Sequence, residues 1–170
     1  PLRRVAWCSN GHYLAQRPLF TLDPLFHAGA YYVQEASSMF SEVAMKAIME
    51  DAAWDEDKLR VLDLCAAPGG KSTHILSLLG ENSLLVSNEV IKSRSVVLAD
   101  NIAKWGSHNV VVSNNDPRDF KSLSEYFNIM FVDAPCSGEG MFRKEPETVN
   151  EWSMANVELC AARQRRILQD

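Results

Sequence analysis

The sequence predicts an α/β fold, in which helices cover both faces of a parallel β-sheet. From residue 59 onward, short apolar segments alternate with segments of helical periodicity, and this alternation is typical of repeated strand–helix units. The apolar segments are almost continuously hydrophobic, as expected of strands that are buried on both faces. The chain has 170 residues, 46% of them hydrophobic, which is enough for one domain with its own core.

The elements of this domain can be placed in order along the chain. The predicted strands are residues 59–64, 84–87, 109–113 and 127–132. The predicted helices are residues 72–79, residues 92–105 and a last helix from Asn150 onward. Gly106 directly follows the middle helix, and glycine is the residue that most often ends a helix.

A β-hairpin is predicted near the N-terminus. Asn10 and Gly11 separate two short apolar runs, residues 5–8 and 12–14, and Asn-Gly between such runs is a strong hairpin signal. The prolines that follow indicate an irregular connection, which leads to a short extended run at residues 30–33.

A helix and a hydrophilic break complete the N-terminal part. Ser37 or Ser38 is placed to cap a helix that runs through Met39, Val43, Ala44 and Ile48. Residues 51–58 are hydrophilic. We therefore expect an N-terminal segment, residues 1–50, ahead of a main domain, residues 51–170.

Both ends of the chain predict a longer protein. The sequence starts with Pro1 rather than methionine, and it stops at Asp170 inside the last predicted helix. The sheet is therefore expected to be incomplete within these 170 residues.

Composition limits the function classes. No apolar run is long enough to span a bilayer, and no secretory leader is present, so a membrane partner is not expected. The four cysteines form no CxxC pair, which argues against a metal site and a disulfide framework and favours a cytoplasmic location. The net charge is −5, so RNA binding would need local basic clusters, although such clusters are more often ordinary solvated surface. The candidate clusters are Arg3/Arg4, Arg143/Lys144 and Arg163/Arg165/Arg166.

Polar residues gather where the predicted strands end. Residues 63–71, 88–89, 114–116 and 133–138 each follow one of the four strands. Because the carboxyl ends of parallel strands share one edge of the sheet, and ligands of such sheets bind there, this edge is the predicted site.

ATP is the first candidate ligand. Gly70-Lys71-Ser72 matches the end of a phosphate-binding Walker loop, but the first glycine of that loop would fall at Cys65. Pro68 also removes one of the backbone N–H donors that the loop requires. Residues 129–133 resemble a magnesium-binding strand end, so a P-loop-like nucleotide hydrolase stays an alternative.

S-adenosylmethionine fits the pattern better than ATP or a dinucleotide. The GxGxxG pattern of dinucleotide sites is missing, since only Gly69 and Gly70 are present. A cofactor without phosphates needs a short glycine turn and carboxylates. Glu89 can accept from ribose hydroxyls, Asp116 from the adenine amino group, and Asp133 can face the ammonium or the sulfonium. Any one of these acids could be a helix cap or loop carboxylate, but three at successive strand ends favour a site.

The fourth strand end suggests methylation at carbon. Pro135-Cys136 directly follows Asp133 and Ala134. A thiolate that adds to C6 of a pyrimidine makes C5 nucleophilic toward a methyl group. Such a thiol needs local activation, and Arg143 and Lys144 are near in sequence. An inert buried cysteine is the alternative.

These residues carry a family resemblance. LDLCAAPGGKST and VDAPCSGEGMFRK resemble motifs of the Sun/Nop family of RNA cytosine-5 methyltransferases. The upstream segment FTLDPLFHAGAYYVQEASSMF resembles the region before the cofactor domain in the bacterial RsmF type, which modifies 16S ribosomal RNA. The resemblance implies a Rossmann-like, S-adenosylmethionine-dependent methyltransferase fold with a small N-terminal hairpin and helix extension.

The resemblance also implies roles for individual residues. Glu89 would bind the ribose and Asp116 the adenine, Asp133 would serve both the cofactor and the target base, and Cys136 would assist release of the methylated RNA. The residues expected around the methionine portion of the cofactor are Cys65, Ala66, Ala67, Pro68, Gly69, Gly70 and Lys71.

The attacking cysteine of this family lies in a later Thr-Cys-Ser/Thr motif. That motif is missing here and is expected after Asp170, so this chain alone is predicted to bind the cofactor weakly at best and not to methylate RNA. The target cytosine must be unstacked, which implies single-stranded or looped RNA, with Tyr31, Tyr32 and Phe142 as candidate contacts. A non-catalytic RNA-binding module on the same fold is the third alternative.

Overall fold

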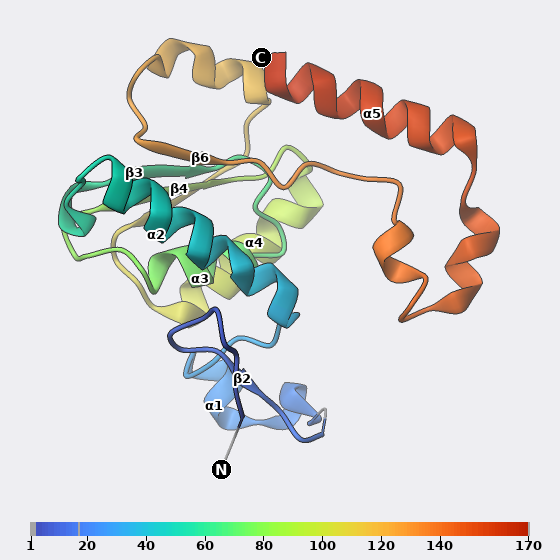
Figure 1. Ribbon diagram of the computed structural model, residues 1–170, viewed down its shortest axis with the longest axis horizontal. Coiled ribbons are helices and arrows are strands. Elements are labelled where there is room, and N and C mark those ends of the chain that lie inside the picture. The colour runs from blue at the N-terminus through green and yellow to red at the C-terminus, as the bar shows by residue number, and fades with distance from the viewer. Residues whose placement is uncertain (1–2, 17, 170) are drawn as a thin grey trace.

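The four strands of the main sheet pair in parallel. In this computed structural model, which describes residues 3–16 and 18–169, they are β3 (Arg60–Asp63), β4 (Leu84–Asn88), β5 (Val110–Ser113) and β6 (Ile129–Phe131), in the spatial order β5-β4-β3-β6. The register places Leu62 beside Val86 and Met130. The predicted α/β fold is thus confirmed. From β3, the chain adds β4 and β5 on one side of the sheet and then β6 on the other side of β3, so the strand order reverses at β3. Figure 1 shows the sheet in the upper left of the view.

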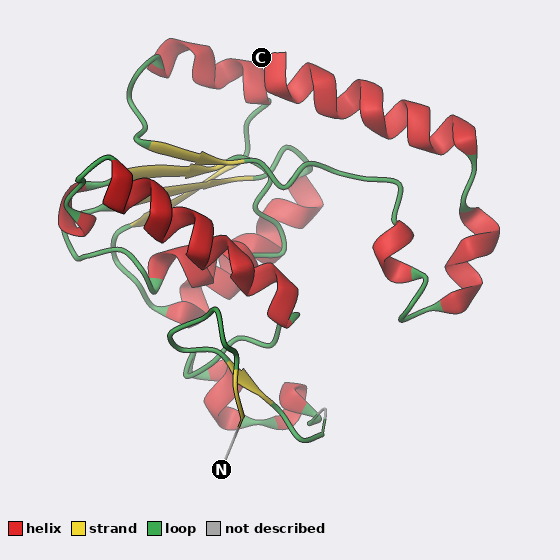
Figure 2. Ribbon diagram, in the orientation of Figure 1, coloured by secondary structure: helices red, strands yellow, loops and turns green. Residues whose placement is uncertain are grey.

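Three helices cover one face of the sheet. They are α2 (Ser41–Asp51), α3 (Gly70–Leu76) and α4 (Lys92–Trp105), and they lie together below the sheet in Figures 1 and 2. Alternate strand residues point to opposite faces, so the face of Val61 meets these helices. The resulting core contains Met45, Val61, Ile75, Leu85, Leu98, Ile102 and Ile129.

A long helix lies over the opposite face. This is α5 (Met154–Gln169), which crosses above the sheet in Figure 1 and packs Ile167 against Leu62 and Leu64. The cover is partial, because Val111 and Met130 on this face are 51% and 52% exposed. Asp170, the last residue of the predicted helix, lies outside the described residues.

The N-terminal hairpin differs from the prediction. Its strands are β1 (Arg3–Arg4) and β2 (His12–Tyr13), so the predicted first strand, residues 5–8, is wrong. Those residues instead form part of a wide turn that Val5 closes by donating its N–H to the Gly11 carbonyl at 2.9 Å. Val5 and Cys8 are buried inside this turn, so their apolar character reflects packing rather than strand pairing.

The connection to α2 is more helical than predicted. A short helix, α1 (Pro24–His27), begins where the Asp23 carboxylate accepts the N–H of Leu25. Residues 30–33 pair with no strand among the described residues. Ser37 and Ser38 do not cap α2, because a 3-10 helix (Ala36–Phe40) precedes it and Phe40 occupies the cap position.

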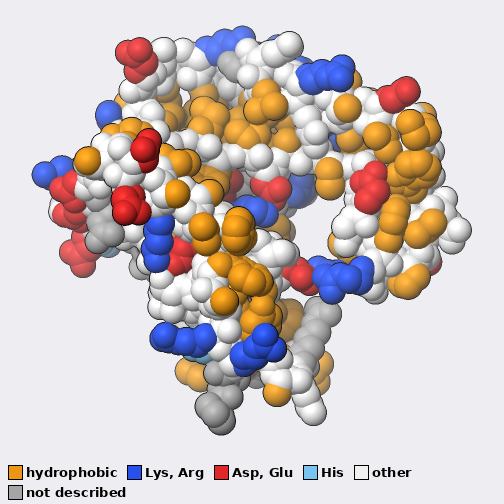
Figure 3. Space-filling model, in the orientation of Figure 1, with side chains coloured by type: hydrophobic (Ala, Val, Ile, Leu, Met, Phe, Trp, Pro, Cys, Tyr) orange, Lys and Arg blue, Asp and Glu red, His pale blue; other side chains and the backbone are white. Residues whose placement is uncertain are grey.

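Residues 134–153 form an arm that leaves the sheet after β6 and returns as α5. The arm contains two 3-10 helices, Glu139–Met141 and Pro146–Glu151, and it stands away from the sheet in Figure 1. The space-filling view in Figure 3 shows an opening between the arm and the body of the molecule. None of the helices in residues 3–16 and 18–169 is long and apolar enough to cross a membrane.

Candidate functional site

The turn after β3 is built by residues 64–70 at the carboxyl edge of the sheet. The N–H of Ala66 donates to the Asn88 carbonyl at 2.8 Å, which ties this turn to the end of β4. Gly69 has a φ of +115° and precedes α3. Residues with side chains adopt this backbone conformation only with strain, so the turn requires glycine at position 69.

A buried acid lies directly beneath the turn. Asp63 is 0% exposed, and one carboxylate oxygen accepts the hydroxyl of Ser72 at 2.7 Å. Ser87 in turn donates to the Ser72 hydroxyl at 3.0 Å. Burial raises the pKa of Asp63 to about 6, and the hydrogen bond from Ser72 opposes this rise. The other oxygen, Oδ1, has no hydrogen-bond partner among the described residues.

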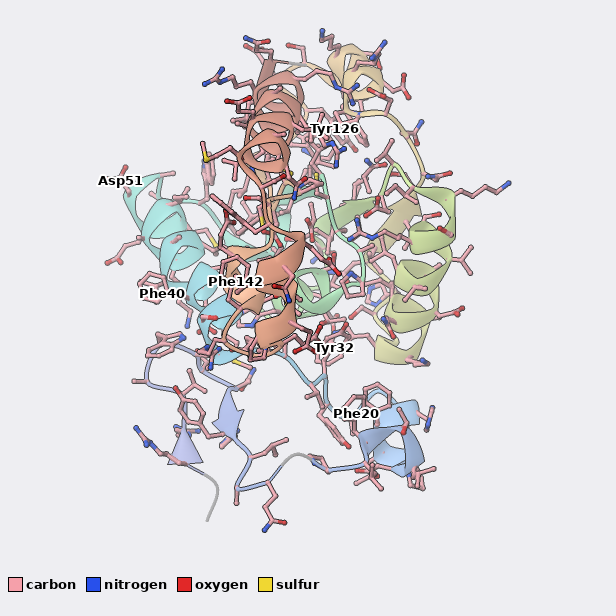
Figure 4. All side chains as sticks on the ribbon, turned by 90° about the vertical axis from the view of Figure 1, so that its right-hand side faces the viewer. Phe20, Tyr32, Phe40, Asp51, Tyr126 and Phe142 are labelled. Atoms are coloured by element: carbon pink, nitrogen blue, oxygen red, sulfur yellow. The ribbon has the colours of Figure 1, made fainter. Side chains whose placement is uncertain are left out.

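A cavity of about 210 Å³ opens beside the turn. Its wall combines three parts of the chain: the segment before α2, the glycine turn and the end of β6. The lining residues are Tyr32, Val33, Gln34, Ser38, Cys65, Ala66, Ala67, Pro68, Gly70, Lys71 and Asp133. Figure 4 shows Tyr32 where the N-terminal segment meets the main domain.

Gly70 allows the N-terminal wall of this cavity to lie close to the turn. A Cβ atom at this position would lie 3.0 Å from Cε1 of Tyr32 and 3.2 Å from Oε1 of Gln34. Those distances are shorter than ordinary van der Waals contacts. Glycine at this position therefore lets Tyr32 and Gln34 of the N-terminal segment pack directly against the turn and form the cavity wall beside it.

Asp133 borders the cavity at the end of β6. Its carboxylate accepts the ammonium of Lys71 at 2.6 Å, and its side chain is still 59% exposed. Asp133 therefore lies between the cavity and the open surface, and Lys71 fixes its position.

Arg94 links the side chain of Glu89 to the glycine turn. Its side chain is only 4% exposed, and its Oε2 lies 3.5 Å from Nη1 of Arg94. Oε1 accepts the N–H of Ile91 at 2.9 Å. Nη2 of Arg94 donates to the Ala67 carbonyl at 2.7 Å. Glu89 is thus held close to the turn, although it does not line the cavity.

Asp116 lies farther along the same edge. Its carboxylate accepts the N–H of Arg118 at 3.2 Å, which caps the 3-10 helix Pro117–Leu123. That hydrogen bond, with the charge of the Arg118 guanidinium, lowers the pKa of Asp116. Arg166 of α5 approaches the same carboxylate at 4.0 Å. Asp116 is outside the cavity lining.

Asn88 joins three strand ends. Its side-chain amide donates to the carbonyls of Leu64 and Asn115, at 3.2 and 3.0 Å. Its oxygen accepts the hydroxyl of Ser113 and the N–H of Asn115, at 2.9 and 3.0 Å. The ends of β3, β4 and β5 are therefore connected by one buried side chain.

The cysteines of the site have different environments. Burial raises the pKa of Cys65 to about 11, and the nearby Glu89, Asp63 and Asp133 carboxylates add to the rise, so Cys65 is a thiol at neutral pH. Cys136 is exposed and free. The cations expected beside it, Arg143 and Lys144, both pair with Glu35, at 3.2 and 2.8 Å.

The structure therefore brings together most of the predicted site, with additions. Cys65, Ala66, Ala67, Pro68, Gly70, Lys71 and Asp133 line one cavity; Gly69 shapes the turn. The pattern of residues did not indicate the N-terminal wall, formed by Tyr32, Val33, Gln34 and Ser38, or the bridging Arg94. Their roles depend on packing between distant segments, for which a single sequence carries no periodic signal.

Comparison with protein families gives two matches that together span most of the chain. Residues 52–170 match the model of the 16S rRNA methyltransferase RsmB/F family. Residues 1–36 match the N-terminal domain of 16S rRNA methyltransferase RsmF.

Curated relatives are similar over the whole chain. Ribosomal RNA small subunit methyltransferase F of Vibrio cholerae serotype O1 (strain M66-2) is 38% identical over 99% of this chain, which corresponds to 35% of the relative. The protein of the same name from Enterobacter sp. (strain 638) is 38% identical over 98% of the chain and 35% of its own length. The chain thus spans about a third of these relatives.

Solved structures share the fold. A methyltransferase homolog protein from Pyrococcus horikoshii superposes with a TM-score of 0.77 at 28% identity, over 99% of this chain and 50% of its own. NSun6 from Pyrococcus horikoshii, solved with SFG, gives a TM-score of 0.72 at 28% identity, over 91% of this chain and 37% of its own.

Proposed function

This chain belongs to the RsmB/F family of 16S rRNA methyltransferases, and we propose that it forms the cofactor-binding portion of an enzyme that methylates C5 of cytosine in 16S rRNA. S-adenosylmethionine is the proposed methyl donor. The observation that carries this proposal is the cavity that the glycine turn and Asp133 line together. The proposed division lies between an N-terminal segment, residues 1–50, and a cofactor domain, residues 51–170.

The residues present fit this cofactor. The cavity is lined by the glycine turn, Lys71 and Asp133, so backbone groups and a carboxylate are both available to the methionine portion. The turn and Lys71 would hold the methionine portion, Glu89 the ribose and Asp116 the adenine. When bound, S-adenosylmethionine supplies an electrophilic methyl group.

Asp133 is proposed to act on the target base. It is fixed by Lys71 at 2.6 Å, yet more than half of its side chain is exposed, so the carboxyl group can hydrogen-bond a pyrimidine ring that enters from the open side. Cys136 follows on the exposed loop and is proposed to assist release of the methylated RNA. The attacking cysteine is expected in the Thr-Cys-Ser/Thr motif after Asp170.

A substitution at Asp133 tests this assignment. In the protein at its full natural length, Asp133→Asn should reduce transfer of labelled methyl groups to a cytosine-containing 16S rRNA segment by at least about 100-fold, because general acid–base groups contribute 10²- to 10⁴-fold. Asp100→Asn, at an exposed residue of α4, is the matched control. Analysis of the nucleosides by mass spectrometry should identify 5-methylcytidine.

Cofactor binding is measured separately. Gly70→Val should weaken binding of S-adenosylhomocysteine, measured by titration calorimetry, because the larger side chain would collide with Tyr32 and Gln34. Gly140→Val, where a Cβ atom meets nothing within 4 Å, should leave this binding unchanged. Metal-dependent binding of ATP in place of S-adenosylhomocysteine, or methylation of another base, would contradict the proposal.

A further inference from the structure

A second cluster of reactive side chains lies outside the cofactor cavity. This Cys8–Glu42–His74 cluster consists of Cys8 in the N-terminal turn, Glu42 in α2 and His74 in α3. All three residues are buried, at 9%, 3% and 6% exposure. Their Sγ, carboxylate and ring nitrogen atoms all lie within 4.8 Å of one another. None of the three lines the cavity described above.

The carboxylate of Glu42 is held in one orientation. Its Oε1 accepts the N–H of Ser9 at 3.0 Å, the Ser9 hydroxyl, and the ammonium of Lys46 at 2.6 Å. Its other oxygen, Oε2, lies 3.2 Å from Nε2 of His74 and also accepts the Ser9 N–H, at 3.2 Å.

His74 is directed into the cluster, toward the Glu42 carboxylate. Its Nε2 is buried and has no hydrogen-bond partner among the described residues, although Oε2 of Glu42 lies 3.2 Å away. Buried polar atoms normally have a partner, and a neutral imidazole nitrogen is a good metal ligand.

The spacing suits a tetrahedral metal ion. Zinc binds histidine nitrogen at about 2.0–2.1 Å and carboxylate oxygen at about 2.0–2.2 Å, which places two such ligands about 3.3 Å apart. The observed separation between Nε2 of His74 and Oε2 of Glu42 is 3.2 Å. Thiolate, imidazole and carboxylate are together the ligand types that zinc prefers. Hydrogen bonds to the free oxygen of a ligating carboxylate, such as those from Ser9 and Lys46, are also typical of metal sites.

Space for sulfur is built into the turn. A Cβ atom at Gly11 would lie 2.9 Å from Sγ of Cys8 and 2.8 Å from Sδ of Met39. Glycine at this position therefore allows Cys8 to point inward from the turn. The sequence predicts no metal site, because Cys8 is not part of a CxxC pair; the three ligands come from separate segments that only the fold brings together.

We propose that Cys8, Glu42 and His74 form a zinc site that fastens the N-terminal turn to α2 and α3. The site contributes to structure rather than to methyl transfer, since it joins the N-terminal segment to the helix that follows the glycine turn. A cluster without metal, in which His74 pairs with Glu42 at 3.2 Å, is the competing explanation.

Metal content tests the proposal in the protein at its full natural length. After treatment with a chelator, addition of Zn²⁺ and dialysis, elemental analysis should find zinc that is lost in Cys8→Ser and in His74→Gln. The matched controls, Cys160→Ser and His108→Gln, should retain it: Cys160 is buried in α5 and His108 is exposed. Zn²⁺ should raise the melting temperature of the unmodified protein and of both controls, while Mg²⁺ should not.

A cobalt measurement covers the case in which a variant fails to fold. Co²⁺ added to the unmodified, metal-free protein should give the visible and thiolate-to-cobalt absorption bands of a tetrahedral site, and Cys8→Ser should lack the thiolate band. The proposal is overturned if no such band forms in the unmodified protein. It is likewise overturned if Cys8→Ser and His74→Gln fold and keep as much zinc as the controls.

Discussion

Asp63 is an acid whose folded environment disfavours its charge. The residue is fully buried, and its carboxyl group accepts a hydrogen bond from the Ser72 hydroxyl at 2.7 Å. Burial raises its pKa to about 6 from an ordinary value of 3.8. The folded protein therefore holds a proton on Asp63 at pH values where the unfolded chain has released it, and the fold is less stable once this proton is lost.

The stability should therefore depend on pH through this residue. Its contribution is fully present below about pH 4 and is lost as pH rises through about 6, at a cost of up to about 3 kcal/mol. In Asp63→Asn, the fall in unfolding free energy between about pH 5 and about pH 7.5, measured by urea denaturation, should be smaller than in the unmodified protein. Asp100→Asn should show the unmodified pH dependence. An equal fall in all three proteins would contradict the expectation.

Single residues of the site differ in how far the sequence can predict them. The glycine turn and Asp133 follow strands with clear apolar signals, so their positions at the sheet edge follow from the alternation of strands and helices. Tyr32 and Gln34 contribute to the same cavity from a segment without regular periodicity. Their contribution depends on how that segment folds back, which local propensity does not determine.

Among the elements, α4 is the one whose ends the sequence predicts best. Its bounds, Lys92–Trp105, agree with the prediction, because an amphipathic pattern is followed by a glycine that adopts a φ of +80°. The hairpin shows the opposite case. Residues 5–8 have the apolar character of a strand, but Val5 and Cys8 are buried in a turn, and apolar character alone does not distinguish pairing from packing.

The glycine after α4 should contribute measurably to stability. Gly106→Ala places a side chain on a left-handed backbone, and nothing lies within 4 Å of the new Cβ atom, so the cost should be the backbone term alone, about 1–2 kcal/mol. Gly140→Ala is the matched control, since its Cβ atom also meets nothing within 4 Å and its φ lies outside the left-handed range. Urea denaturation should show a loss for Gly106→Ala and a change within about 0.5 kcal/mol for Gly140→Ala. Equal losses would show that left-handed strain is not the cause.

At the scale of the whole molecule, Glu35 connects the arm to the N-terminal segment. Its carboxylate pairs with Lys144 at 2.8 Å and with Arg143 at 3.2 Å. The hydrogen bond and charge of Lys144 hold the pKa of Glu35 below its ordinary value. All three side chains are at least 40% exposed, so water and salt weaken the contact.

Removing this contact should loosen the arm. Glu35→Gln should increase trypsin cleavage after Arg143 and Lys144 by about two- to five-fold at low salt, the range expected of exposed ion pairs. Raised salt should accelerate cleavage of the unmodified protein and remove the difference. Glu50→Gln, at an exposed position of α2, is the control. Cleavage rates that do not distinguish Glu35→Gln from this control would show that the ion pairs do not restrain the arm.

The side chain of Asn88 has a further consequence for the molecule. It contacts Leu64, Ser113 and Asn115 at once, so the tips of three strands share one fixed geometry. The strand ends are already ordered in the folded protein. Binding of a ligand therefore costs little additional conformational entropy in the protein. The sheet edge is in this sense a preorganised receptor.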